Sequence, residues 1–236
     1  MKKRSFVLSY FTKTETLLWC ISTVLILASF LLFDRENYLT LAASLIGVTS
    51  LIFNAKGNPF GQFLMIIFSI LYGIISYGRS YYGEMITYLG MTGPMAFFAL
   101  ISWLRNPYKG NRAEVQVNRL KKAEILFMAV LTGVITFIFY YILAYFHTSN
   151  LLLSTVSITT SFIAVYLTYR RNAYFAAAYA ANDIVLILLW GIAALSNRSY
   201  LSVLVCFIVF LINDIYGFIN WKKMQKRQNQ NNCNGL

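Results

Sequence analysis

The stretch from Ala173 to Leu195, AYFAAAYAANDIVLILLWGIAAL, decides the class of fold. Its length and apolar character suit an α-helix that crosses a lipid bilayer. Near its middle it carries Asn182 and Asp183, and a charged side chain at that depth costs about 2.5–3.5 kcal/mol on insertion scales. A membrane protein tolerates such a group where it faces a wet cavity, a partner side chain or a ligand.

One face of this helix is polar and aromatic. Ala176, Tyr179, Asp183 and Trp190 recur at i, i+3, i+7 and i+14, and these spacings place them on the same side of a helix. An acid flanked by a phenol and an indole suits a flat, polar ligand that can carry a positive charge. We therefore predict a substrate-binding face. A structural Asp183, paired inside a helical bundle, is the alternative.

The composition extends this prediction to the whole chain. Of the 236 residues, 58% are hydrophobic and 12% are charged, whereas a soluble domain has about 25% charged residues. We predict an all-α polytopic membrane protein, embedded in the lipid bilayer, with eight transmembrane helices. The predicted spans are 15–33, 38–53, 59–78, 83–104, 123–146, 151–169, 173–195 and 200–221.

The net charge of +12 is distributed unevenly between the connections. Seventeen of the 20 Lys and Arg residues fall in the termini and in alternate loops, and only Arg35, Arg79 and Arg198 lie in the others. Cytoplasmic loops carry such an excess of cations, so both termini are predicted to be cytoplasmic. The cations are accounted for by this rule, and we expect no nucleic-acid partner.

The sequence carries no recognisable enzyme or metal motif. His147 is the single histidine, and the three cysteines are scattered. We therefore expect no metal, no cofactor and no catalytic residue. Asp183 and Asp214 could form an intramembrane aspartyl pair, but neither has the glycine context that lets a peptide backbone approach, so an enzyme is disfavoured.

A basic loop at 105–122 divides the chain into two similar parts. Matching features follow at nearly constant offsets of 114, 119 and 118 residues, namely Asn58 and Asn172, Arg79 and Arg198, and Trp103 and Trp221. We predict two parallel three-helix bundles, because a single linker span between them gives both the same orientation. The predicted segments are an N-terminus with an extra peripheral helix (1–37), the first bundle (38–104), the loop with the linker helix (105–150), the second bundle (151–221) and a basic, polar cytoplasmic tail (222–236).

Further polar side chains repeat along the other spans. They are Gln62, Ser69 and Tyr72 in the first half, and Asn213 and Tyr216 in the last span. We predict that they converge with Asp183 on a substrate cavity at the bundle axis. Hydrogen bonding between helices is the alternative for Gln62 and Ser69, and a position at the membrane surface is the alternative for Tyr216.

Two features of the spans concern packing. Trp103 and Trp221 adjoin basic residues and are predicted to be membrane-interface anchors. Gly90, Gly93 and Pro94 mark a helix that can bend or approach its neighbours closely.

Three segments resemble the PnuC family of nicotinamide riboside transporters. They are NAKGNPFGQFLMIIFSILYGIISYGRSYYGEM from Asn54, YFAAAYAANDIVLILLW from Tyr174 and FLINDIYGFINWKKM from Phe210. The resemblance covers about residues 38–224, and the extra first span is similar to that of members from Gram-positive bacteria. It implies a fold like that of SWEET sugar transporters, a 3+1+3 arrangement, usually as a homotrimer. It also implies facilitated uptake across the bacterial plasma membrane, with a cytoplasmic kinase trapping the substrate.

The family pattern Trp-x-x-Trp-x-x-x-Asn/Asp falls here on Ala176, Tyr179 and Asp183. The resemblance implies that Asp183 attracts the pyridinium cation and that Tyr179 and Trp190 stack on its ring, while Asn182 and Asn213 bind hydroxyl or amide groups. Because two positions of the pattern are altered, thiamine, riboflavin or a deoxyribonucleoside remains an alternative substrate. A substrate-binding component of an ATP-driven importer is a further alternative.

The charge distribution predicts the topology of the chain. Single cysteines introduced at Arg35, His147 and Arg198 should react with a membrane-impermeant reagent added outside the cell. A cysteine at Lys109 should react only after the membrane is made permeable. Reaction of the Lys109 position in intact cells would reverse the predicted orientation.

Overall fold

The computed structural model describes residues 10–78, 81–148 and 150–233, with side chains described as far as residue 231. Within these residues, eight helical segments are long and apolar enough to cross a membrane. This finding confirms the predicted all-α class and the number of spans. The helices are α2 (Lys13–Phe33), α3 (Tyr38–Ala55), α4 (Phe60–Gly78), α5 (Tyr82–Thr87), α6 (Gly93–Arg105), α7 (Lys122–Tyr145), α8 (Leu151–Tyr169), α9 (Phe175–Ser196) and α10 (Leu201–Cys233).

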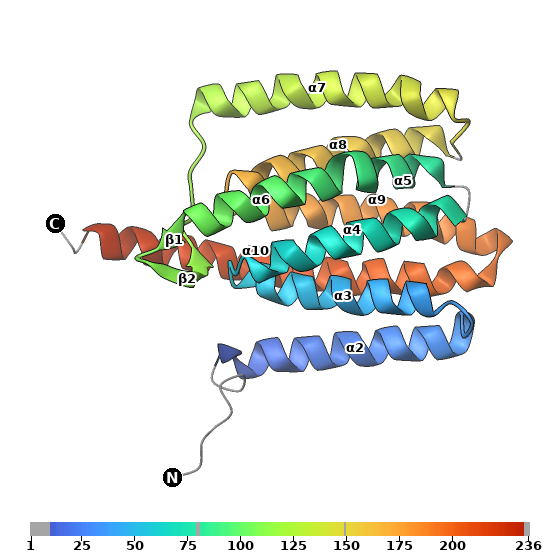
Figure 1. Cartoon of the computed structure of the whole chain (residues 1–236), viewed down its shortest axis with the longest axis horizontal. Coiled ribbons are helices and arrows are strands. Elements are labelled where there is room, and N and C mark those ends of the chain that lie inside the picture. Colours follow the sequence, from blue (N-terminus) through green and yellow to red (C-terminus); the bar gives the residue numbers. More distant parts are fainter. Residues whose placement is uncertain (1–9, 79–80, 149, 234–236) are drawn as a thin grey trace, which may run out of the picture.

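The helices lie side by side as one bundle (Figure 1). α4 packs against α3 and α6 in the first half, and α9 packs between α8 and α10 in the second. The two halves meet along two seams, α3 with α10 and α6 with α8. α7 lies at one edge of the bundle on α8, and α2 lies at the opposite edge on α3 and α10.

Two tryptophans join the halves by reciprocal hydrogen bonds. Trp103 Nε1 at the end of α6 donates to Thr168 O near the end of α8, over 2.9 Å. Trp221 Nε1 in α10 donates to Asn54 O near the end of α3, over 2.7 Å. Each bond goes to a carbonyl group in the last turn of a helix, where intrahelical donors are lacking, and adds to the backbone bond that each carbonyl accepts, from Arg171 N at Thr168 O and from Gly57 N at Asn54 O. The exchange relates the two halves as the sequence repeat predicts.

The prediction that Trp103 and Trp221 are membrane-interface anchors is wrong. Both side chains are fully buried, and their rings lie 5.3 Å apart. Phe175 packs on them, 4.7 Å from Trp221. Neighbouring basic residues suggested an interface, but the indoles turn inward, where their N–H groups find carbonyl partners.

A short hairpin covers this end of the bundle, which we call the hairpin end. Strands β1 (Pro107–Tyr108) and β2 (Asn111–Val115) pair antiparallel within the loop that sequence analysis left without structure. Val115 N donates to Gly57 O over 2.9 Å, and Asn118 N donates to Arg171 O over 2.9 Å. The loop thereby bonds to the helix connections of both halves. Gly57 has a φ of +68°, a conformation that glycine adopts without steric cost.

The last helix is longer than predicted. α10 continues past the expected end at residue 221 to Cys233 without a break. Its extension carries no glycine or proline before Cys233, and it is anchored on the hairpin. Gln228 accepts from Val117 N (2.8 Å) and donates to Val115 O (3.1 Å). The segment 222–233 is therefore part of a helix and not an extended tail.

The span between residues 82 and 105 is interrupted by a π-helical turn, η1 (Tyr88–Thr92), which lies between α5 and α6. Pro94 follows this turn at the start of α6, and proline cannot donate the backbone hydrogen bond that would continue an α-helix. At Gly93 a side-chain carbon would lie 3.1 Å from Tyr88 O of this turn, and at an ordinary contact distance of 3.5 Å from Ser69 Cβ of α4. Gly93 and Pro94 thus mark an irregular turn of the helix.

The reciprocal bonds predict a loss of stability on substitution. Trp221→Phe keeps most of the ring but removes the indole donor, so that Asn54 O keeps only the hydrogen bond from Gly57 N, and the loss of one hydrogen bond costs about 0.5–1.5 kcal/mol. Thermal unfolding of the detergent-solubilised protein should show a melting temperature lower by several degrees. The matched control is Trp19→Phe, which also removes an indole donor, to Thr49 Oγ1, but at a half-exposed position. Equal shifts in the two variants would contradict the structural role of Trp221.

Candidate functional site

Two buried carboxyl groups face each other between α9 and α10. Asp183 is 4% exposed and Asp214 is 5% exposed, and their carboxyl groups are within hydrogen-bonding reach of each other. Among the described residues, neither has a basic ion-pair partner, and Asp183 Oδ2 has no hydrogen-bond partner. Two carboxylates in such contact need a proton or a cation between them. The pair is thus suited to attract a positively charged group.

An aromatic cluster lies beside this acid pair. Trp190 Nε1 donates to the Tyr72 hydroxyl over 2.7 Å, and the Tyr72 ring lies 4.4 Å from the ring of Tyr88. Phe68 stacks on Tyr72 with ring centres 5.6 Å apart. Tyr88 is an electrostatic neighbour of Asp183. α4, η1 and α9 therefore bring aromatic faces and a carboxyl group to one place.

The structure joins two of the predicted site residues directly, Tyr72 and Trp190, and Tyr88 connects them with Asp183. Tyr179 also belongs here, because it is an electrostatic neighbour of both aspartates and forms a hydrogen bond with Thr168. Tyr72 and Trp190 come from different halves of the chain. The sequence repeat relates equivalent positions of the two halves but does not show which residues contact each other, so it could not predict this hydrogen bond.

The remaining predicted residues point toward neighbouring helices. Asn182 Oδ1 accepts from hydroxyl groups of α8, those of Ser157 (3.3 Å), Thr160 (2.8 Å) and Ser161 (3.0 Å). The side-chain oxygen of Asn182 is therefore fully engaged. Its role in this structure is to hold α8 against α9.

Two residues of α10 face the extra helix. Asn213 Nδ2 donates to Ser22 Oγ of α2 over 2.9 Å, and the Tyr216 hydroxyl donates to Glu15 Oε1 over 3.2 Å. Sequence analysis treated the first span as peripheral and assigned these side chains to the bundle axis. The structure instead uses them to attach α2, although Asn213 Oδ1 is buried without a partner among the described residues.

The polar side chains of α4 are engaged near their own backbone and α3. Gln62 Nε2 donates to Asn54 Oδ1 over 2.8 Å, and Ser69 Oγ donates to Met65 O over 2.8 Å. These contacts are the interhelical and local hydrogen bonds that formed the alternative for both residues.

Sequence analysis missed two residues of this region, Glu84 and Tyr88. Glu84 is 1% exposed, lies beside Ser157, and is an electrostatic neighbour of Tyr72 and Tyr88. An acid inside an apolar span is the same signal that singled out Asp183. Its position near a loop hid Glu84, and the π-helical turn that orients Tyr88 has no sequence pattern of its own.

The interior is closed in this conformation. A cavity of about 10 Å³ adjoins Phe68 and Tyr72, and also touches Ser44 and Cys206. It has room for about one water molecule, whereas small-ligand pockets measure roughly 300–1,000 Å³. Aromatic side chains pack beyond it, with Trp190 4.7 Å from Tyr81 and 5.6 Å from Tyr200. A larger ligand can enter only when helices move apart.

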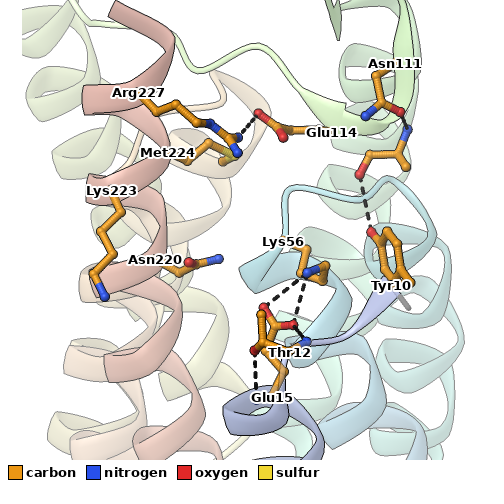
Figure 2. A pocket seen from close by; sticks show the side chains of 11 residues that line it. Tyr10, Thr12, Glu15, Lys56, Asn111, Glu114, Asn220, Lys223, Met224 and Arg227 are labelled. Carbon is orange, nitrogen blue, oxygen red and sulfur yellow. Dashed lines mark hydrogen bonds and ion pairs between the residues drawn. The ribbon is translucent and has the colours of Figure 1, made fainter. Parts of the chain in front are cut away.

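A separate pocket of about 500 Å³ opens at the hairpin end between α10, the start of α2 and the hairpin. Its acids are already paired, Glu15 with Lys56 (3.0 Å) and Glu114 with Arg227 (Figure 2). Burial raises the pKa of the Tyr10 phenol on its wall above the usual value. The contacts of Glu15 in this pocket thus fix the N-terminal end of α2, and both of its acids are paired without a ligand.

Fold and site together define a multi-pass membrane protein with two related three-helix halves around a buried acidic and aromatic centre. Residues 37–223 match the family model described as "Nicotinamide mononucleotide transporter". The chain belongs to this family. It is a family of transporters and not of enzymes.

Proteins of known name and structure are similar over most of the chain. A nicotinamide riboside transporter PnuC of Neisseria mucosa is 27% identical over 213 residues, which cover 89% of this chain and 81% of that protein. One of Haemophilus influenzae is 26% identical over 198 residues, 82% of this chain and 83% of that protein. The crystal structure of the vitamin B3 transporter PnuC superposes with a TM-score of 0.82 at 26% identity, covering 94% of this chain and 96% of that one.

The Tyr72–Trp190 bond is a testable element of the site. Tyr72→Phe leaves the fully buried indole N–H of Trp190 without an acceptor, which should destabilise the protein by about 1–3 kcal/mol. The measurement is thermal unfolding of the purified protein. Tyr77→Phe is the matched control, because Tyr77 lies on the same helix but is 62% exposed and should leave the melting temperature unchanged. If Tyr72→Phe leaves the melting temperature unchanged, the Tyr72–Trp190 hydrogen bond does not stabilise the site.

Proposed function

We propose that the protein carries nicotinamide riboside across the bacterial plasma membrane by facilitated diffusion. The observation that carries the proposal is the buried Asp183 with a free carboxyl oxygen near Tyr88. The Tyr88 ring adjoins Tyr72, which is the hydrogen-bond partner of Trp190. A pyridinium ring offers a positive charge to the carboxylate and a flat face to the aromatic rings. The names of the similar transporters support this class of substrate.

Alternating access would arise from the two seams between the halves. The indoles of Trp103 and Trp221 close the hairpin end, and Trp190 with Tyr81 closes the opposite end. Rocking of one half against the other would open these two layers in turn around a site that stays between them. With the hairpin end on the cytoplasmic side, a kinase in the cytoplasm would trap the entering riboside.

From the family resemblance we also propose that the protein forms a homotrimer. α7 packs mainly on α8 and is otherwise exposed, so its surface is available for contacts between subunits or with lipid. The resemblance further supports transport without an external energy source, in which free substrate equilibrates down its own gradient. The alternatives are a different vitamin or nucleoside as substrate, or a role as the binding component of an ATP-driven importer.

Transport by the purified protein in liposomes tests the proposal directly. Radiolabelled nicotinamide riboside should equilibrate across the membrane without ATP and without accumulation. An excess of unlabelled nicotinamide riboside should compete, whereas thiamine, riboflavin and deoxyribonucleosides should not. Competition by one of these instead would reassign the substrate, and accumulation driven only by an imposed proton or sodium gradient would overturn facilitated diffusion.

Substitutions of Asp183 test the role of its charge. Asp183→Asn keeps the shape and hydrogen bonding, so transport should persist with affinity lowered by roughly tenfold to a hundredfold, a loss of about 1.4–2.8 kcal/mol. Asp183→Ala removes the acceptors as well and should nearly abolish transport. Both variants should fold, because they remove one of two facing carboxyl groups. Melting temperature and affinity are measured on the same preparations, and a large loss of stability with unchanged affinity would instead assign Asp183 a structural role.

A further inference from the structure

A second acid in the membrane interior is left without a positive partner. Glu84 is 1% exposed, and none of the ion pairs among the described residues includes it. Its Oε2 atom is buried and has no hydrogen-bond partner in the described part of the chain. Burying a polar atom without a partner costs free energy, and ionisable groups in membrane spans mark functional sites by default.

The position of Glu84 connects it with the centre of the candidate site. Tyr88 is an electrostatic neighbour of both Glu84 and Asp183, and Tyr72 is a neighbour of Glu84. Ser157 lies beside Glu84, and its hydroxyl donates over 3.3 Å to Oδ1 of Asn182, the residue before Asp183. The two acids therefore belong to one contiguous polar and aromatic region, contributed by α5, η1, α8 and α9.

The backbone around Glu84 holds the carboxyl group in a defined direction. Gly83 lets α5 approach Thr148 and Leu143, since a side-chain carbon there would lie 2.8 and 2.9 Å from their side chains. Ser157 lies beside the carboxyl group, and Oε2 has no hydrogen-bond partner among the described residues. A carboxylate fixed in this way accepts hydrogen bonds from hydroxyl groups and donates none.

The chemistry of the substrate separates the roles of the two acids. A monocationic riboside carries its single positive charge on the ring, and Asp183 is the acid that would bind this charge. Its other strong donors are the neighbouring 2′- and 3′-hydroxyl groups of the ribose. Carboxylates bind ribose hydroxyls in dinucleotide-binding folds by accepting from them, and the free oxygen of Glu84 is available for the same contact.

Resting on the proposed function, we propose that Glu84 binds the ribose hydroxyl groups and thereby makes the site selective for ribosides. Tyr72 and Tyr88, which lie between the acids, would hold the substrate with its cationic ring toward Asp183 and its sugar toward Glu84. The free base lacks the sugar and would lose this contact completely. The 2′-deoxy analogue would lose the part made by one hydroxyl.

The test measures equilibrium binding of three probes to the purified, full-length protein: nicotinamide riboside, its 2′-deoxy analogue and nicotinamide. The wild-type protein should bind the riboside at least tenfold more tightly than the deoxy analogue. Glu84→Gln should weaken riboside binding by about tenfold to a hundredfold, the effect of losing a hydrogen bond to a charged group. Binding of the deoxy analogue, which keeps only the 3′-hydroxyl contact, should weaken by a smaller factor, so the selectivity between the two ligands falls.

Two further variants complete the test. Glu124→Gln is the matched control, because Glu124 is an acid of α7 whose partner is Arg170, and its selectivity should equal that of the wild type. Glu84→Asp keeps the charge but withdraws the carboxyl group by one methylene, and it should also lose selectivity. If Glu84→Gln does not fold, the selectivity of Glu84→Asp between the riboside and the deoxy analogue tests the role of Glu84.

Each outcome separates this inference from the proposed function. A wild-type protein that binds none of the three probes contradicts nicotinamide riboside as substrate. A wild-type protein that binds the riboside and the deoxy analogue equally leaves that function intact and overturns the role of Glu84. Equal weakening of both ligands in Glu84→Gln would also overturn it, since Glu84 would then act on the cation or on the fold.

Discussion

The exchange of two indole hydrogen bonds between the halves is the interaction on which the other contacts depend. Trp103 and Trp221 each donate to the last turn of a helix in the opposite half. Each carbonyl also accepts from a backbone N–H of its own half, Asn54 O from Gly57 N and Thr168 O from Arg171 N. Each indole therefore adds a second hydrogen bond to a carbonyl with two lone pairs, and this mutual alignment of the halves provides both. The alignment sets both seams, and it places Tyr72 of one half against Trp190 of the other.

With the seams fixed, the interior separates into structural and ligand-suited polar groups. Asn182 and Gln62 have their hydrogen bonds completed by neighbouring helices. Asp183 and Glu84 each keep a buried oxygen without a partner among the described residues. This contrast is the physical basis for assigning function, because a satisfied amide holds helices together, whereas a free buried carboxyl oxygen is stable only with something else bound to it.

Hydropathy predicted all eight spans, since length and apolar composition suffice for that purpose. The site stays a prediction: Tyr72 and Trp190 form a hydrogen bond, and Tyr88 connects them with Asp183. Asn213 was assigned to the axis because helical periodicity gives the face of a helix but not the neighbour that covers it. Here α2 covers that face. Glu84 escaped notice because it lies near a loop, and Tyr88 because periodicity does not represent a π-helical turn.

The extra helix α2 reinforces one of the two seams between the halves and not the other. It packs on both α3 and α10 and therefore staples one seam from outside, with Glu15 bonded to Lys56 after α3 and to Tyr216 of α10. The other seam has no equivalent, since α7 packs mainly on α8. Because α2 holds the α3–α10 seam together from outside, we expect this seam to act as the hinge when the halves move apart. The opening would then form at the other seam, between α6 and α8.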